Sequence, residues 1–122
     1  MAIPDWVRQL FQSIDVMDTN KFLTFLSEDA QFKFGNAPPA IGKKAVGQAV
    51  DGFFTTIRGI SHRLINTWTD SSSLVCQGEA TYTRHDGSQV TIPFVNVFGM
   101  KGKLIKDYLI YIDITPLYNP AG

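Results

Sequence analysis

The order of periodic segments predicts an α+β fold, with helices first and an antiparallel sheet after them. Apolar residues recur at helical spacing in the first half of the chain, and from 60 to 115 they alternate as in strands. The Asp86-Gly87 step between two alternating runs indicates a hairpin. A chain of 122 residues suffices for one hydrophobic core, so we predict a single domain over residues 1–122.

Three helices are expected before the sheet. The first covers residues 4 to about 17, where a proline suits the first turn and apolar residues follow at spacings of three and four. The second is short and is capped by Asp18 or Thr19. The third covers residues 43–57. Between the second and third helices, AQFKF alternates like a strand, and the two prolines of NAPPAIG exclude regular pairing.

Four long strands are expected after the helices. They are ISHRLINTWTD, SLVCQGEATYTR, SQVTIPFVNVFGM and KLIKDYLIYIDIT. The better inner face of the last strand consists of Tyr108, Ile110, Ile112 and Ile114. A three-residue turn near 100–102 would place this face beside Phe94 and Asn96, whereas a two-residue turn would reverse it.

The Asp86-Gly87 turn sets the register of the two middle strands. If these residues form a two-residue loop, Glu79 lies opposite Phe94. The predicted inner face then consists of Gln77, Glu79, Thr81, Thr83, Val90, Ile92, Phe94 and Asn96. Gln77, Glu79 and Asn96 on such a face indicate a cavity rather than a dry core. A bulge at Gly78 or Pro93 would shift part of this register.

The predicted outer face of the sheet is also largely apolar. It carries Cys76, Ala80, Tyr82, Val95, Val97, Leu109 and Tyr111. Three short helices can cover only one side of the sheet, and a large exposed apolar patch usually marks an interface. We therefore expect a homodimer packed through this outer face.

Charge and composition exclude several functional classes. The formal net charge is zero and 44% of residues are hydrophobic, which argues against a nucleic-acid-binding protein. No apolar run is long enough to span a membrane, and the first ten residues lack a signal-peptide pattern. A single cysteine, Cys76, fits a cytoplasmic location. The segment GKKAVG lacks phosphate-loop spacing, and no cysteine or histidine cluster has metal-ligand spacing, so we expect no cofactor and no metal.

Four segments carry a family resemblance. After two or three N-terminal helices, DAQFKF, GEATYTRHDG, IPFVNVF and YIDITPL resemble a SnoaL-like domain over nearly the whole chain. That family belongs to the superfamily of ketosteroid isomerase, limonene epoxide hydrolase and nuclear transport factor 2. The resemblance implies a cone-shaped fold, in which three N-terminal helices pack in a strongly bent, mainly antiparallel sheet around a deep apolar pocket.

The catalytic residues of these relatives do not carry over as complete sets. The general-base aspartate of ketosteroid isomerase falls on Phe34, and its protonated aspartate donor falls on Asn96. The aspartate–arginine–aspartate set of limonene epoxide hydrolase falls on Thr81, Glu79 and Ile110. The resemblance therefore implies the fold more strongly than the reaction.

Glu79 is the leading candidate for proton transfer. A carboxylate on an inward face beside Phe94 is poorly solvated, which suits a general acid or base, and Asn96 and Tyr108 would orient an oxygen of the ligand. The predicted ligand-binding residues are Phe32, Phe34, Gln77, Thr81, Ile92, Phe94, Ile110, His62 and Trp68. Alternatively, Glu79 is tied to a neighbouring donor, and Gln77 and Asn96 satisfy one another across the hairpin.

These observations favour a protein that holds a small apolar molecule with one or two oxygens. We predict a cofactor-independent enzyme of the isomerase, cyclase or epoxide-hydrolase type. The alternative is a non-catalytic ligand-binding or dimerisation module of the same fold.

Overall fold

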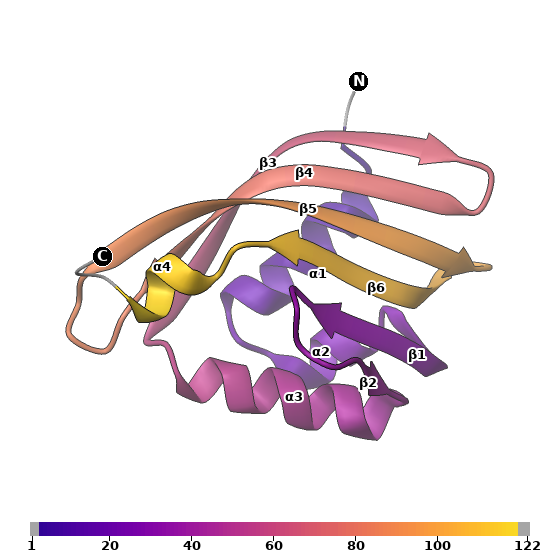
Figure 1. Ribbon diagram of the computed structural model, residues 1–122. Coiled ribbons are helices and arrows are strands. Elements are labelled where there is room, and N and C mark those ends of the chain that lie inside the picture. The colour runs from indigo at the N-terminus through magenta and orange to yellow at the C-terminus, as the bar shows by residue number, and fades with distance from the viewer. Residues whose placement is uncertain (1–2, 120–122) are drawn as a thin grey trace.

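The fold consists of a strongly bent sheet and three helices on its concave side (Figure 1). The computed structural model describes residues 3–119. The helices are α1 (Asp5–Asp15), α2 (Thr19–Leu23), α3 (Lys43–Thr55) and a short α4 (Thr115–Tyr118). The predicted α+β cone with three N-terminal helices is confirmed, whereas α4 begins where we expected the last strand to continue. Within residues 3–119, no helix is both long and apolar enough to cross a membrane.

Six strands form one sheet in the order β2-β1-β6-β5-β4-β3. The strands are β1 (Leu26–Phe34), β2 (Ala40–Ile41), β3 (Gly59–Asp70), β4 (Ser73–Thr83), β5 (Gln89–Lys101) and β6 (Leu104–Ile112). The β1–β6 pair is parallel and the other pairs are antiparallel. The four long strands were predicted. The short β2 was not, because it directly follows the two prolines that we expected to exclude pairing.

Helix α1 brings its last residue to the β3 edge of the sheet. Val7, Leu10 and Phe11 are buried and fix the helix on the core. The helix packs against β3 and ends at Asp15. A carboxylate at the carboxyl end of a helix opposes the helix dipole, so Asp15 gains nothing from its own helix. Its position is explained by a tertiary contact to His62, described below.

The register predicted for the β4–β5 hairpin is wrong by one residue. Thr83 pairs with Gln89, and a hydrogen bond between Arg84 and Ser88 leaves a loop of three residues, 85–87, rather than two. The Arg84 N–H donates to the Ser88 carbonyl at 2.8 Å, the Gly87 N–H donates to the Arg84 carbonyl at 2.9 Å, and Gly87 has φ +89°. This arrangement is a type I turn followed by a left-handed glycine, the usual three-residue hairpin loop.

A one-residue shift places every side chain of one strand on the opposite face. The β4 residues on the concave face are therefore Cys76, Gly78, Ala80 and Tyr82, and those on the convex face are Gln77, Glu79, Thr81 and Thr83. On β5, Asn96, Phe94 and Ile92 remain on the concave face as predicted.

Gly78 allows the shifted register to pack. It pairs with Phe94, and a Cβ atom added there would lie 2.6 Å from the Arg63 carbonyl oxygen and 2.9 Å from the Phe94 ring. Both distances are shorter than Cβ contacts allow, so only glycine lets the Phe94 ring lie against the sheet.

The predicted inner face of β6 is confirmed through a different turn. Lys101 pairs with Leu104, which makes a two-residue turn, and the register then shifts at Gly99/Met100. This bulge restores the pairing of Asn96 with Ile110 and keeps Tyr108 buried on the concave side.

The convex face differs from the predicted one. Cys76, Ala80 and Tyr82 are buried in the core, not on the outer face. An apolar row still crosses four neighbouring strands in register, through Trp68, Val75, Val97 and Leu109. Tyr111 is 59% exposed next to this row, and Trp68 is 49% exposed at its end.

Candidate functional site

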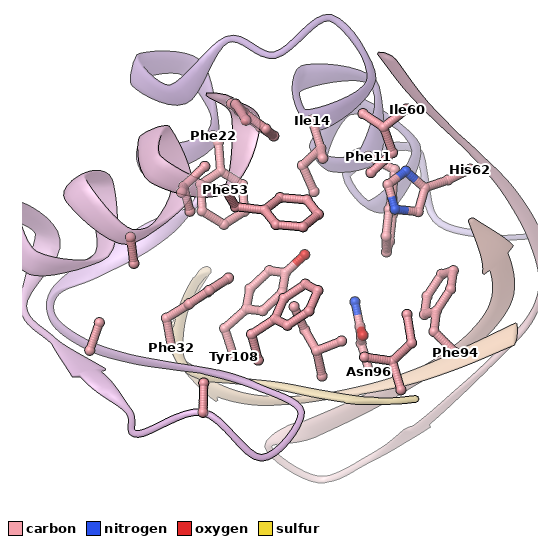
Figure 2. Close-up of a pocket in the computed structure, with 18 of the residues that line it drawn as sticks. Phe11, Ile14, Phe22, Phe32, Phe53, Ile60, His62, Phe94, Asn96 and Tyr108 are labelled. Atoms are coloured by element: carbon pink, nitrogen blue, oxygen red, sulfur yellow. The ribbon is translucent and has the colours of Figure 1, made fainter. Parts of the chain in front are cut away.

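A cavity of about 230 Å³ lies between the concave face of the sheet and the helices (Figure 2). The residues that line it are Phe11, Ile14, Phe22, Phe32, Phe34, Ala37, Pro38, Ala40, Ala49, Val50, Phe53, Phe54, Ile60, His62, Tyr82, Phe94, Asn96, Tyr108, Ile110 and Ile112. They include no aspartate, glutamate, lysine or arginine. His62 is thus the one lining residue, among those the structure describes, that carries a ring-nitrogen lone pair able to accept a proton.

His62 is held on the cavity wall by Asp15. One oxygen of the Asp15 carboxylate lies 2.5 Å from Nδ1 of the His62 ring, and the other accepts the His62 backbone N–H at 3.2 Å. The His62 side chain is 8% exposed and packs between the rings of Phe11 and Phe94, with centroid distances of 4.8 and 5.5 Å. The ring therefore has little freedom to rotate.

The Asp15 contact determines which ring nitrogen is available. A carboxylate only accepts hydrogen bonds, so in the neutral ring Nδ1 carries the proton and Nε2 carries the lone pair. Because Asp15 occupies Nδ1, the Nε2 atom is the one that a molecule in the cavity can reach. The carboxylate would also stabilise the imidazolium that forms when Nε2 takes a proton.

Asn96 contributes a buried amide with an unmet hydrogen bond. The side chain extends from β5 toward the cavity, and the residue is 2% exposed (Figure 2). No hydrogen-bond donor among residues 3–119 reaches its Oδ1 atom. An unpaired buried acceptor costs about 1–3 kcal/mol, and only a hydrogen-bond donor would relieve this cost. The Asn96 NH2 group is a separate donor, which Figure 2 shows toward the cavity, and it can donate to an oxygen of a bound molecule.

Two tyrosines add hydroxyl groups. Figure 2 shows the Tyr108 hydroxyl pointing from β6 into the cavity, and Tyr82 lines it from β4. Burial raises the pKa of both phenols well above the ordinary value, with smaller contributions from neighbouring titratable groups. Both hydroxyls therefore stay protonated around neutral pH and can donate a hydrogen bond.

Glu79 lies outside the cavity. It occupies the convex face of β4, where its carboxylate accepts from Arg63 on β3 at 2.8 Å. Both side chains are partly exposed. The one-residue register shift thus removes the desolvated environment on which its candidacy depended, and the alternative of a glutamate tied to a neighbouring donor describes its contacts.

The other predicted residues divide between the cavity and the rest of the molecule. Of these residues, the cavity is lined by Asn96, Tyr108, Phe32, Phe34, Phe94, Ile110 and His62. Gln77 and Thr81 lie on the convex face with Glu79, and the Thr81 hydroxyl pairs with that of Thr91 at 2.8 Å. Gln77 lies opposite Val95 rather than Asn96. Ile92 is buried but does not line the cavity, and Trp68 is 49% exposed on the convex face.

Asp15, Phe11 and Tyr82 belong to the site but were not among the residues predicted from the sequence. Asp15 lies 47 positions before His62, so no local pattern joins them. The predicted two-residue loop places Tyr82 on the outer face, and the observed register places it in the cavity. Within the described residues, no group of three or more histidines, cysteines and carboxylates could hold a metal ion. The buried Cys76 thiol has its pKa raised to about 11 by desolvation, so it remains an unreactive thiol.

The bent sheet, the helices on its concave side and the cavity between them define the cone-shaped α+β class. The chain belongs to the SnoaL-like domain family, whose model matches residues 7–108. No curated protein matches this sequence.

Solved structures share the fold at low sequence identity. An NTF2-like protein of unknown function from Burkholderia pseudomallei is similar with a TM-score of 0.84 and 16% identity, over 93% of this chain and 92% of that one. A putative SnoaL-like polyketide cyclase from Jannaschia sp. has a TM-score of 0.80 and 14% identity, over 93% and 86%. An LEH-like epoxide hydrolase from M. tuberculosis has a TM-score of 0.76 and 12% identity, over 93% and 84%.

Proposed function

We propose that this protein is a cofactor-independent enzyme that moves a proton on a small apolar molecule bearing oxygen. The reaction would be of the isomerase, cyclase or epoxide-hydrolase type. One observation carries the proposal: His62, oriented by Asp15 at 2.5 Å, stands on the wall of a cavity that is otherwise almost entirely apolar. The names of two structural relatives, a putative polyketide cyclase and an LEH-like epoxide hydrolase, are compatible with it.

His62 takes the role that the sequence analysis had given to Glu79. Nε2 would accept a proton from a C–H group or a water molecule, and would return it at another atom of the same ligand. Asp15 is a positioning residue, because it holds Nδ1 and has no place in the lining of the cavity. The apolar wall keeps bulk water from competing for Nε2.

Asn96 and Tyr108 would bind the ligand oxygen. When a proton leaves carbon next to a carbonyl group, negative charge develops on the carbonyl oxygen, and hydrogen-bond donors at that oxygen lower the barrier. The Asn96 amide and the Tyr108 hydroxyl extend from neighbouring strands into the same space (Figure 2). They can therefore contact one oxygen together.

Deuterium exchange tests proton transfer before the natural substrate is known. A panel of cyclic ketones, enones and terpenoid ketones is incubated with the protein in heavy water, and deuterium next to the carbonyl is followed by mass spectrometry. A parallel panel of epoxides is followed for diol formation. We expect at least one compound to react, and we expect His62→Gln to lower that rate by about 10²–10⁴-fold.

Two controls locate the activity. His85→Gln changes the second histidine, which is exposed and contacts the Thr55 carbonyl, and should leave the rate unchanged. Glu79→Gln should also leave it unchanged, because Glu79 lies on the convex face. Equal rates for wild type and His62→Gln would rule out the proposed base. Ligands that bind but never react would favour the non-catalytic ligand-binding module.

A further inference from the structure

His62 and the exposed residues of the cavity lie at opposite ends, and the buried Asn96 lies between them on a central strand. The side chains of His62, on β3, and Asn96, on β5, are almost wholly buried. The lining residues that are exposed to solvent are Ala37, Pro38 and Ala49, from the β1–β2 connection and from α3. The cavity thus has a closed polar end and an open apolar end.

Sheet order separates these ends in space. Strands β1 and β2 form one edge of the sheet and β3 forms the other, with β6, β5 and β4 between them. Four strand spacings separate β1 from β3, or about 19 Å along the curved sheet. Figure 2 shows Phe32 of β1 and His62 of β3 on opposite sides of the cavity, with Tyr108 and Asn96 between them. A molecule lying across the strands would therefore contact both ends.

We propose that the ligand is an elongated amphiphile that binds with its oxygen-bearing end first. The oxygen lies at the closed end against Asn96, Tyr108 and His62, and the hydrocarbon end lies in the opening between the β1–β2 connection and α3. This inference deepens the proposed function and rests on it, because it takes the same cavity as the ligand site.

The volume of the cavity limits the buried part of the ligand. A dry apolar cavity of about 150 Å³ accommodates benzene, which has six non-hydrogen atoms. In proportion, a cavity of about 230 Å³ accommodates about nine such atoms. A longer molecule must extend through an opening, and the apolar one between Ala37, Pro38 and Ala49 suits a hydrocarbon chain.

Aromatic rings border the path from the closed end to the opening. Phe53 of α3 packs on Phe34 of β1 with 5.1 Å between ring centroids, and on Tyr82 with 5.9 Å. Phe34 and Phe53 are half-buried, so their remaining exposed surface is apolar area that a hydrocarbon chain would cover. Covering it adds to the affinity of long chains in proportion to the area removed from water.

A series of para-alkylphenols tests the orientation. Dissociation constants are measured by calorimetry for phenol and for its para-propyl, para-hexyl and para-octyl derivatives. Each methylene group buried inside the cavity should tighten binding by up to about fourfold. Beyond propyl we expect smaller but continued gains, because the chain leaves through an apolar opening. A closed cavity would instead reject the hexyl and octyl compounds.

A variant with a charge at the opening tests which end of the ligand lies there. Ala49→Glu places a carboxylate at an exposed helical position that lines the cavity, where glutamate is a good helix former. We expect this change to raise the dissociation constant of para-octylphenol by about tenfold and that of phenol by less than about twofold. Gln48→Glu is the matched control, since Gln48 is also exposed on α3 but does not line the cavity.

The outcomes separate the two proposals. If no phenol binds, the cavity is not a ligand site for oxygen-bearing apolar molecules, and both proposals fail. If phenol binds but affinity falls from propyl to octyl, or if Ala49→Glu weakens phenol as much as para-octylphenol, the orientation is wrong and the proposed function stands. Octyl binding tighter than propyl, with the loss confined to long chains in Ala49→Glu, supports the orientation.

Discussion

Replacing Asp15 by alanine should destabilise the fold substantially. The change removes two hydrogen bonds, one to the His62 ring and one to the His62 backbone N–H. Hydrogen bonds to a charged partner contribute about 1.5–3 kcal/mol each. The Asp15 side chain is 27% exposed, so water replaces part of the loss, and we expect a total cost of about 2–4 kcal/mol.

The expected shift in melting temperature follows from the size of the chain. An unfolding entropy of about 2.1 cal/mol/K per residue, over 122 residues, makes 1 kcal/mol equivalent to about 4 °C. Asp15→Ala should therefore lower Tm by roughly 8–16 °C. Urea denaturation gives the free energy directly. Asp5→Ala is the control on the same helix, because Asp5 is an exposed first-turn residue and its loss should cost less than about 1 kcal/mol.

A double-mutant cycle isolates the contact between the side chains. Asp15→Ala is measured in the wild type and in His62→Phe, where the backbone hydrogen bond remains and the ring hydrogen bond does not. We expect a coupling energy of about 1 kcal/mol or more. If the free-energy costs of Asp15→Ala and His62→Phe add up to that of the double mutant within about 0.5 kcal/mol, Asp15 does not hold the His62 ring. The proposed orientation of Nε2 is then refuted.

Three further predictions concern packing, ionisation and assembly. Gly78→Ala should destabilise the fold by about 1–3 kcal/mol through its clash with the Arg63 carbonyl, whereas Gly52→Ala, with open space around it in α3, should stabilise it by about 0.5–1 kcal/mol; urea denaturation checks both. The raised pKa of Tyr108 predicts that stability falls as pH rises above about 10 by up to about 1.4 kcal/mol per unit, because the unfolded phenol ionises first, and Tyr108→Phe should flatten that slope in denaturation series at increasing pH. The apolar row on the convex face leads us to expect a homodimer, which Val97→Asp should dissociate; a wild type that sediments as a monomer would contradict this.

The hairpin shows how a correct local signal can lead to a wrong face. Asp86-Gly87 predicted a turn, and a turn is present, but the dipeptide fits both a two-residue and a three-residue loop. The Asp86 carboxylate accepts from the backbone N–H and the hydroxyl of Ser88, at 2.8 and 2.6 Å, and these contacts accompany the longer loop. Since strand side chains alternate with period two, the one-residue difference exchanged Glu79 for Gly78 on the concave face.

Errors in turn length have little effect where a bulge compensates for them. The β5–β6 turn has two residues, whereas the predicted inner face required three. Tyr108 and Ile110 still lie on the predicted face because the register shifts at Gly99/Met100. Apolar patterning identified that face, and the bulge keeps it buried. The inner face of β6 could therefore be predicted from alternation, whereas the cone shape was implied by the family resemblance.

The Asp15–His62 pair could not be predicted from local patterns. The face of β3 on which His62 lies depends on the β3–β4 pairing. Its contact to Asp15 depends on a helix that ends 47 residues earlier. One signal was available: a carboxylate on the last turn of an amphipathic helix opposes the helix dipole. Such a carboxylate is a candidate partner for a histidine elsewhere in the chain.

The tautomer of His62 tests the central claim most directly. Proton–nitrogen correlation NMR on isotopically labelled protein distinguishes the two ring nitrogens, and the chain has two histidines, so His85→Gln assigns the signals. We predict that the neutral His62 ring carries its proton on Nδ1 and that the Nε2 resonance shifts when para-propylphenol fills the cavity. A neutral ring protonated on Nε2, or an Nε2 resonance that does not respond to saturating ligand, would contradict the assignment of His62 as the group that moves the proton.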